Sequence, residues 1–132
     1  MKKVTIKKVL FVCIENSCRS QLAEAITNHF FSNKLEAFSA GSNPSKKINP
    51  KAISSLKRIQ IIHFGYNKTI DEMINKSYDF VVGMGCGDRC PIIRGAKKLE
   101  WDIPDPKTFD NIEFDNVRDL IKDKIISDLI LL

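Results

Sequence analysis

The segment CIENSCRS, residues 13–20, places a cysteine directly after the apolar run 9–12 and an arginine six positions further on. A tight turn from a strand into a helix can direct several backbone N–H groups at one anion, and the helix dipole adds partial positive charge. The same donors favour the thiolate form of Cys13, and the guanidinium of Arg19 matches two oxygens of a tetrahedral oxyanion. We therefore interpret this segment as an anion-binding loop with a nucleophilic thiol. The alternative is a packed cysteine followed by a helix cap.

Each loop residue has an expected part in binding the substrate. The Ser20 hydroxyl is placed to donate to the thiolate, and Asn16 is expected to brace the loop through hydrogen bonds to its backbone. Cys18 is interpreted as a packing residue at the helix start rather than as a redox partner. The expected substrate-binding residues are Ile14, Glu15, Asn16, Ser17, Cys18, Arg19 and Ser20.

A second pair of cysteines, Cys86 and Cys90, follows the apolar run FVVGM at residues 80–84. The pair is at most half of a metal site, because no second pair and no histidine lies nearby in the sequence, so we expect no metal ion and no cofactor. Gly85, Gly87 and Pro91 are typical of a flexible segment, and thiol exchange needs accessible sulfurs. The alternative is two cysteines packed beneath a loop.

The segment DIPDP, residues 102–106, offers a general acid. A proline-stiffened loop can hold the carboxyl of Asp105 over a bound anion, within reach of an oxygen that must be protonated. Asp102 is the local competitor for this role, and an ordinary Asp-Pro turn is the structural alternative.

Strand-like and helix-like segments alternate along the chain. Apolar runs predict strands at 9–12, 35–40, 80–84 and 99–101, and helical periodicity predicts helices over 20–31 and from about Phe114 onward. Asn49 before Pro50 predicts a helix start, with Ile53, Leu56 and Ile59 facing inward, and Thr69 with Glu72 has the spacing of a capping box. This order predicts one α/β domain over residues 1–132, with a parallel sheet covered on both faces. Ligands bind beyond the carboxyl ends of such strands, so we expect Cys13 and Cys86 at one edge of the sheet.

Hydrophobic runs and the distribution of charge argue against membranes and nucleic acids as partners. No apolar run approaches the roughly 20 residues that span a bilayer, and the run at 9–12 is too short for a secretory signal, so we expect a cytoplasmic protein with reduced cysteines and no membrane partner. Residues 1–66 carry 11 Lys and Arg against 3 acids, and residues 67–132 carry 10 against 13. The lysines are scattered and no nucleic-acid motif accompanies them. A basic surface that attracts small anions is therefore expected, not a nucleic-acid interface.

Four segments together resemble a known family. VCIENSCRSQLAEA at residues 12–25 resembles the phosphate-binding loop of the low-molecular-weight protein tyrosine phosphatase superfamily. With AGSNPSKKINPKAI at 40–53, GMGCGDRCP at 83–91 and WDIPDP at 101–106, the chain resembles the thioredoxin-coupled arsenate reductases of that superfamily. The resemblance implies a single-domain, monomeric three-layer sandwich, with a central parallel sheet of about four strands in the order 2-1-3-4.

The resemblance also implies a reaction. Cys13 would attack the arsenic of arsenate while Arg19 and the loop amides hold its oxygens, and Asp105 would protonate the departing hydroxyl. Cys86 would then attack Cys13 and release arsenite, Cys90 would take over Cys86, and thioredoxin would reduce the resulting disulfide. Phosphate and sulfate would compete for the loop.

Two other functions stay open. The first is a phosphatase acting on phosphotyrosine or a small phosphate ester through Cys13, Arg19 and Asp105, although Lys107, Thr108 and Phe109 follow the Asp-Pro pair where related phosphatases usually have tyrosines. The second is a non-catalytic oxyanion-binding module. Glu15 stands where relatives often carry glycine, and unless it points outward it is expected to repel strongly acidic substrates.

Overall fold

The four strands form one parallel sheet at the centre of the molecule. The computed structural model describes residues 5–85 and 91–131. The strands are β1 (Lys7–Cys13), β2 (Leu35–Gly41), β3 (Phe80–Gly83) and β4 (Lys97–Glu100), in the order β2-β1-β3-β4. Cys13 pairs with Gly41 of β2, and Val12 pairs with Gly83 of β3. The expected sheet and strand order are therefore confirmed, and the strands that flank Cys13 end beside it.

Capping side chains explain where the helices begin. The helices are α1 (Arg19–Phe30), α2 (Pro50–Lys57), α3 (Ile70–Met73) and α4 (Asn111–Ile125), and a π-helical turn, Ile126–Ile130, extends α4. The Asn49 side chain accepts from the N–H of Lys51, and Thr69 with Glu72 forms the expected capping box. Asp110 accepts from the N–H of Glu113, so the last helix begins at Asn111 rather than near Phe114.

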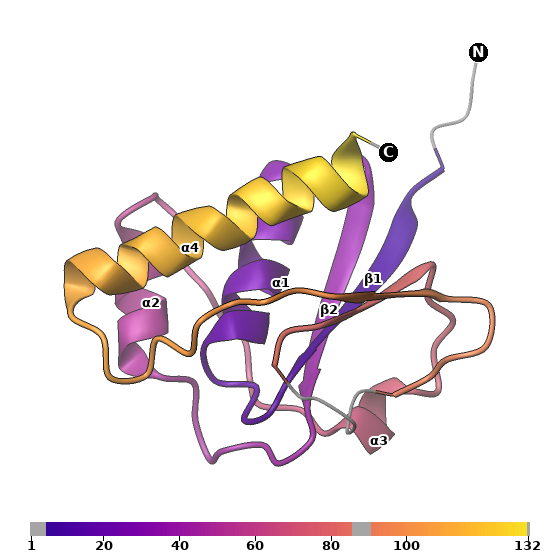
Figure 1. The fold of residues 1–132 in the computed structure, drawn as a ribbon, viewed down its shortest axis with the longest axis horizontal. Coiled ribbons are helices and arrows are strands. Elements are labelled where there is room, and N and C mark those ends of the chain that lie inside the picture. Colours follow the sequence, from indigo (N-terminus) through magenta and orange to yellow (C-terminus); the bar gives the residue numbers. More distant parts are fainter. Residues whose placement is uncertain (1–4, 86–90, 132) are drawn as a thin grey trace.

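Helices cover both faces of the sheet. Val9, Phe11 and Cys13 of β1 point into the larger hydrophobic cluster, which α1, α2 and α4 cover. The alternating residues Leu10 and Val12 point into a smaller cluster that includes Met73 of α3. In Figure 1, α1, α2 and α4 gather together and the short α3 lies apart from them. The expected three layers are present, with one thick and one thin helical layer.

The inward face of α2 is as expected at Leu56, and Ile59 just after the helix packs against the same hydrophobic cluster, but Ile53 differs. Ile53 is 41% exposed, and the buried residues of α2 are Ala52, Ser55 and Leu56. The cause is polar: Arg58, just after α2, donates two hydrogen bonds of 2.6 and 2.7 Å to Asp115 of α4, and Ser55 also donates to Asp115. This pairing turns α2 so that Ser55 faces α4 and Ile53 faces outward.

None of the helices in the described part of the chain is long and apolar enough to cross a membrane.

Candidate active site

In the loop between β1 and α1, several backbone carbonyls point towards the neighbouring segment 42–49. The carbonyls of Cys13, Ile14, Glu15 and Ser17 accept hydrogen bonds of 2.8–3.2 Å from backbone N–H groups of the segment 42–49. Among the described residues, no protein group accepts from the backbone N–H groups of residues 14–18. These N–H groups lie at the start of α1, where the helix dipole also favours negative charge, so together they form an anion-binding cradle.

The Cys13 thiol lies at the base of this cradle and is 2% exposed. Its sulfur is 2.8 Å from the Ser20 hydroxyl, and the side-chain amide of Asn16 donates to the same hydroxyl oxygen at 2.8 Å. Because Asn16 occupies a lone pair of that oxygen, the hydroxyl is free to donate its proton to the sulfur. The Ser20 hydroxyl is therefore a hydrogen-bond donor directed at the Cys13 sulfur.

A cavity of about 210 Å³ opens over the thiol. Asn16 and Ser20 lie fully buried behind the loop, where they brace it. Cys86 and Cys90 lie outside the described residues. The residues that line the cavity are Cys13, Ile14, Glu15, Ser17, Cys18, Arg19, Asn43, Asp105 and Lys107.

Arg19 is held in place from two directions. Its Nη1 donates to the Ile103 carbonyl at 3.2 Å, and its Nη2 lies 3.9 Å from the Asp105 carboxylate. Gly85 has a φ of 100°, and a Cβ there would lie 2.3 Å from Nη1 of Arg19, so only glycine permits this approach. The guanidinium therefore lies between the end of β3 and the Asp-Pro loop. Of the two aspartates in that loop, Asp105 and not Asp102 lines the cavity.

Glu15 is neutralised by a lysine of the Asp-Pro loop. Lys107 Nζ lies 3.1 and 3.2 Å from the two carboxylate oxygens of Glu15. The hydrogen bond to Glu15 raises the pKa of Lys107. The pair joins the anion-binding loop to the Asp105 loop at the cavity mouth, so the repulsion expected from Glu15 is offset by a cation.

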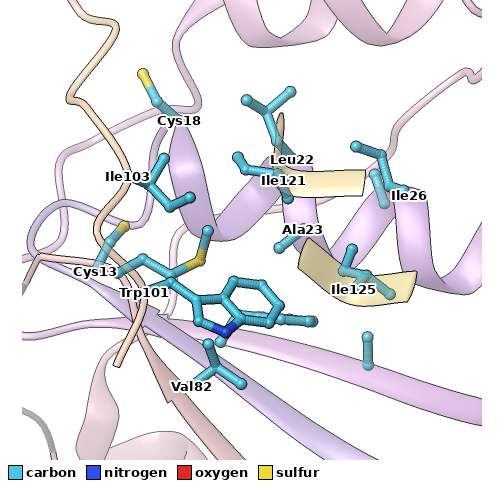
Figure 2. Close-up of a cluster of buried hydrophobic side chains, with 14 of the residues drawn as sticks. Cys13, Cys18, Leu22, Ala23, Ile26, Val82, Trp101, Ile103, Ile121 and Ile125 are labelled. Carbon is cyan, nitrogen blue, oxygen red and sulfur yellow. The ribbon is translucent and has the colours of Figure 1, made fainter. Parts of the chain in front are cut away.

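Cys18 is placed for packing. Its side chain is 5% exposed, and burial is the main cause that raises the pKa of its thiol. Figure 2 shows Cys18 and Cys13 at one end of the larger hydrophobic cluster, near Ile103 and Trp101. A raised pKa leaves less of the Cys18 thiol in the reactive thiolate form at neutral pH.

Four residues that contact the site were not predicted from the sequence as site residues: Gly41, Asn43, Gly85 and Lys107. Gly41 ends β2, and a Cβ there would lie 2.6 Å from the Ile14 carbonyl, so this glycine admits the loop backbone. Asn43 reaches the cavity from the segment that wraps the loop. The turn residues of GSNPS and the glycine after FVVGM were visible signals, but their contacts with Ile14 and Arg19 are long-range.

The geometry agrees with the comparisons to known proteins. The family model for low molecular weight phosphotyrosine protein phosphatases matches residues 8–129. The chain belongs to this family. It is therefore an enzyme, and residues 13–20 lie within the matched region.

Relatives within the family are named arsenate reductases. One from Staphylococcus xylosus is 38% identical over 120 residues, which cover 88% of this chain and 91% of the relative. A thioredoxin-dependent arsenate reductase from Corynebacterium glutamicum superposes with a TM-score of 0.78 at 31% identity, over 92% of this chain and 59% of that chain. An arsenate reductase in the phosphate-binding state superposes with a TM-score of 0.81 at 29% identity, over 92% of this chain and 95% of that chain.

Proposed function

We propose that this protein reduces arsenate to arsenite at Cys13 and is recycled by thioredoxin. The observation that carries the proposal is the cradle of N–H groups at residues 14–18, which donate to no described protein group, above a thiol that Ser20 is placed to stabilise. Arsenate and phosphate have nearly the same size and charge, so a cradle for one accepts the other. We infer that the whole chain acts as one monomeric domain in the cytoplasm, where thiols stay reduced.

The first step is nucleophilic attack on arsenic. The loop amides and Arg19 bind the oxygens of arsenate, and the Cys13 thiolate forms a sulfur–arsenic bond. One arsenic–oxygen bond breaks, and the oxygen leaves as water after Asp105 supplies a proton. Asp105 lines the cavity opposite the thiol loop, and its carboxylate lies 3.9 Å from Arg19, which binds the same anion.

The second step moves two electrons to arsenic. The Cys86 thiolate attacks the Cys13 sulfur, and the sulfur–arsenic bond breaks with its electron pair on arsenic. Arsenite is released, and a Cys13–Cys86 disulfide remains on the enzyme. Cys90 then attacks Cys86, which frees the Cys13 thiolate, and thioredoxin reduces the Cys86–Cys90 disulfide. Both resolving cysteines lie outside the described residues. Gly85, the residue before Cys86, packs against Arg19, which supports the proposal.

A phosphatase is the second candidate function, because the same cradle with Cys13, Arg19 and Asp105 can form and hydrolyse a phosphocysteine. Phe109 is the aromatic residue that follows the Asp-Pro pair, and it packs against the hydrophobic core. Lys107, directly after the pair, is engaged with Glu15. Neither residue offers an aromatic wall for phosphotyrosine, which favours a small inorganic anion as substrate.

The test is arsenate-dependent NADPH oxidation with thioredoxin and thioredoxin reductase, run beside a glutathione and glutaredoxin system. We expect turnover with thioredoxin and none in Cys13→Ser. Aryl phosphate hydrolysis without arsenate-dependent NADPH oxidation in either system would instead identify a phosphatase. Anion binding without either activity would identify a binding module. Turnover with glutaredoxin alone would retain arsenate reduction but replace the reductant.

A further inference from the structure

A buried set of polar side chains lies beneath the anion-binding loop, and the proposed reaction does not use it. Its centre is Lys68, which is 6% exposed. The Lys68 ammonium lies 3.4 Å from Oε1 of Glu24 on α1, donates to the Tyr66 carbonyl at 3.1 Å, and stands 4.8 Å from the centroid of the Tyr66 ring. A buried ammonium is costly unless it is paired and hydrogen-bonded, and here it is both.

This set reaches the loop through one residue, Asn16. The N–H of Lys68 donates to Asn16 Oδ1 at 2.8 Å, and the Gln21 amide donates to Asn16 Oδ1 and to its carbonyl, both at 3.1 Å. The same Gln21 amide donates to the Tyr66 carbonyl at 2.9 Å, and Asn67 donates to the Asn16 carbonyl at 3.0 Å. The segment 66–68 and α1 therefore grip Asn16 from two sides.

Asn16 in turn holds the reacting thiol. Its side-chain amide donates to the Ser20 hydroxyl, which lies 2.8 Å from the Cys13 sulfur. Asn16 has a φ of 53°, a left-handed conformation that persists only where its surroundings enforce it. The ammonium holds the segment 66–68, and the path continues from the backbone N–H of Lys68 through Asn16 and Ser20 to Cys13.

The ammonium ties the segment 66–68 to α1. Glu24, its partner on α1, also accepts from Ser39 Oγ of β2 at 3.2 Å, so its carboxylate is anchored between helix and sheet. Without the ammonium, the segment 66–68 would lose its ionic attachment to this anchor. Among the described residues, the largely buried Glu24 carboxylate would keep as a basic partner only the more distant His63, at 4.0 Å, whose pKa is lowered by burial.

We propose that Lys68 is a positioning residue for Cys13, acting as a built-in cation that fixes Asn16 and, through it, the hydrogen bond that stabilises the thiolate. The proposal rests on the assignment of Cys13 as nucleophile in the proposed function. It predicts that loss of the ammonium impairs the thiolate and the cradle, although Lys68 is not among the residues that line the cavity.

The test uses Lys68→Ala and two readouts that need no arsenate. One is the rate at which iodoacetamide alkylates Cys13, followed by mass spectrometry from pH 6 to pH 9, and the other is protection of Cys13 by inorganic phosphate. We expect alkylation at pH 6 to be about tenfold slower than in the wild type, with the two rates converging by pH 9, because free thiols ionise near pH 8.5 without help. We expect phosphate protection to need about tenfold more phosphate, because the cradle is no longer held in its binding geometry.

Chemical rescue separates a missing ammonium from general damage. n-Propylammonium chloride replaces the atoms that Lys68→Ala removes, and we expect it to restore both readouts in part. Tetramethylammonium chloride at the same concentration controls for ionic strength and should restore neither. Lys8→Ala is the matched control variant, because Lys8 pairs with Glu36 in an exposed ion pair at the opposite end of β1, and it should behave as the wild type.

A second variant covers the case in which Lys68→Ala does not fold. Glu24→Gln combined with Lys68→Met removes both charges and leaves none unpaired, so it should fold, show the same slow alkylation at pH 6, and gain nothing from n-propylammonium. Wild-type or faster alkylation at pH 6 in either folded variant, or equal rescue by tetramethylammonium, would overturn the proposal. Because neither readout involves arsenate, a failure of the arsenate reductase proposal would leave this test intact.

Discussion

At the scale of single residues, the proposed reaction depends most on Cys13 and Arg19. Cys13→Ser should abolish arsenate reduction and any aryl phosphate hydrolysis, because a neutral hydroxyl lacks the nucleophilicity of a thiolate. Arg19→Lys should lower kcat/KM by about a hundredfold or more, because an ammonium cannot make the two-pronged contact with an oxyanion. Steady-state kinetics with arsenate measures both. Substantial turnover by Cys13→Ser would remove the basis for every later step.

The pair of Glu15 with Lys107 makes a separate residue-scale prediction. Glu15→Gly removes a carboxylate at the cavity mouth and frees the Lys107 ammonium. The inhibition constant of phosphate against arsenate reduction should therefore fall about fivefold at low salt. Lys107→Ala leaves Glu15 without its cation and should weaken inhibition by a similar factor. Inhibition constants at 20 mM and 500 mM salt check this, since screening should shrink both effects. Constants that match the wild type in both variants at low salt would show that the pair does not act on the anion.

At the scale of elements, the contact between α2 and α4 depends on Asp115. Hydrogen bonds from Arg58 are the main cause that holds the pKa of Asp115 below its ordinary value of 3.8, and Ser55 adds to the effect. A depressed pKa means that the stabilisation is fully present above about pH 4 and is lost as pH falls through the lower, folded-state pKa. Asp115→Asn should therefore lower the free energy of unfolding by about 1 kcal/mol at pH 7 and by less below pH 3.

Urea denaturation at the two pH values measures this difference. Asp119→Asn is the matched control, because Asp119 lies on the same helix, pairs with Arg118 and has a side chain that is 61% exposed. It should change stability far less. Equal destabilisation by the two variants would mean that the pair between Arg58 and Asp115 adds nothing beyond surface charge.

The same elements show how far the sequence could predict the fold. Local signals were sufficient where a helix start is encoded by its own residues, as at Asn49 with Pro50 and at Thr69 with Glu72. The start of α4 was predicted too late because the prediction followed the apolar periodicity, which begins at Phe114, although Asp110 and Glu113 have the spacing of a capping box. The burial of Leu56 was predicted correctly and that of Ile53 wrongly, because the contact of Ser55 and Arg58 with Asp115 joins segments about 60 residues apart.

In the candidate site, too, contiguous sequence signals could be predicted and long-range contacts could not. The loop 13–20 was predictable because strand, thiol, arginine and helix start are contiguous. The contributions of Gly85 and Lys107 could not be predicted, because each depends on a contact with a residue distant in sequence. Gly85 contacts Arg19, and Lys107 pairs with Glu15.

At the scale of the whole molecule, the topology brings the thiol loop and the end of β3 together. The N–H of Met84 donates to the Val12 carbonyl at 2.8 Å, so the chain leaves β3 beside the strand that ends at Cys13. Cys86→Ser should therefore leave aryl phosphate hydrolysis intact, since water completes that cycle, and should stop arsenite release. Arsenite assays beside a phosphatase assay check this, and loss of both activities in Cys86→Ser would point to damage to the site rather than to a missing resolving thiol.

The order of the thiols is the central claim, and Cys90→Ser tests it most directly. After one equivalent of arsenate, this variant should release one arsenite per enzyme and accumulate a Cys13–Cys86 disulfide, because no third thiol can free Cys13. Thioredoxin should then fail to support further turnover. Mass mapping of the disulfides decides the matter: a Cys13–Cys86 disulfide in nearly every molecule is the predicted result. Full multiple turnover, or the absence of that disulfide, would contradict the relay and favour the phosphatase.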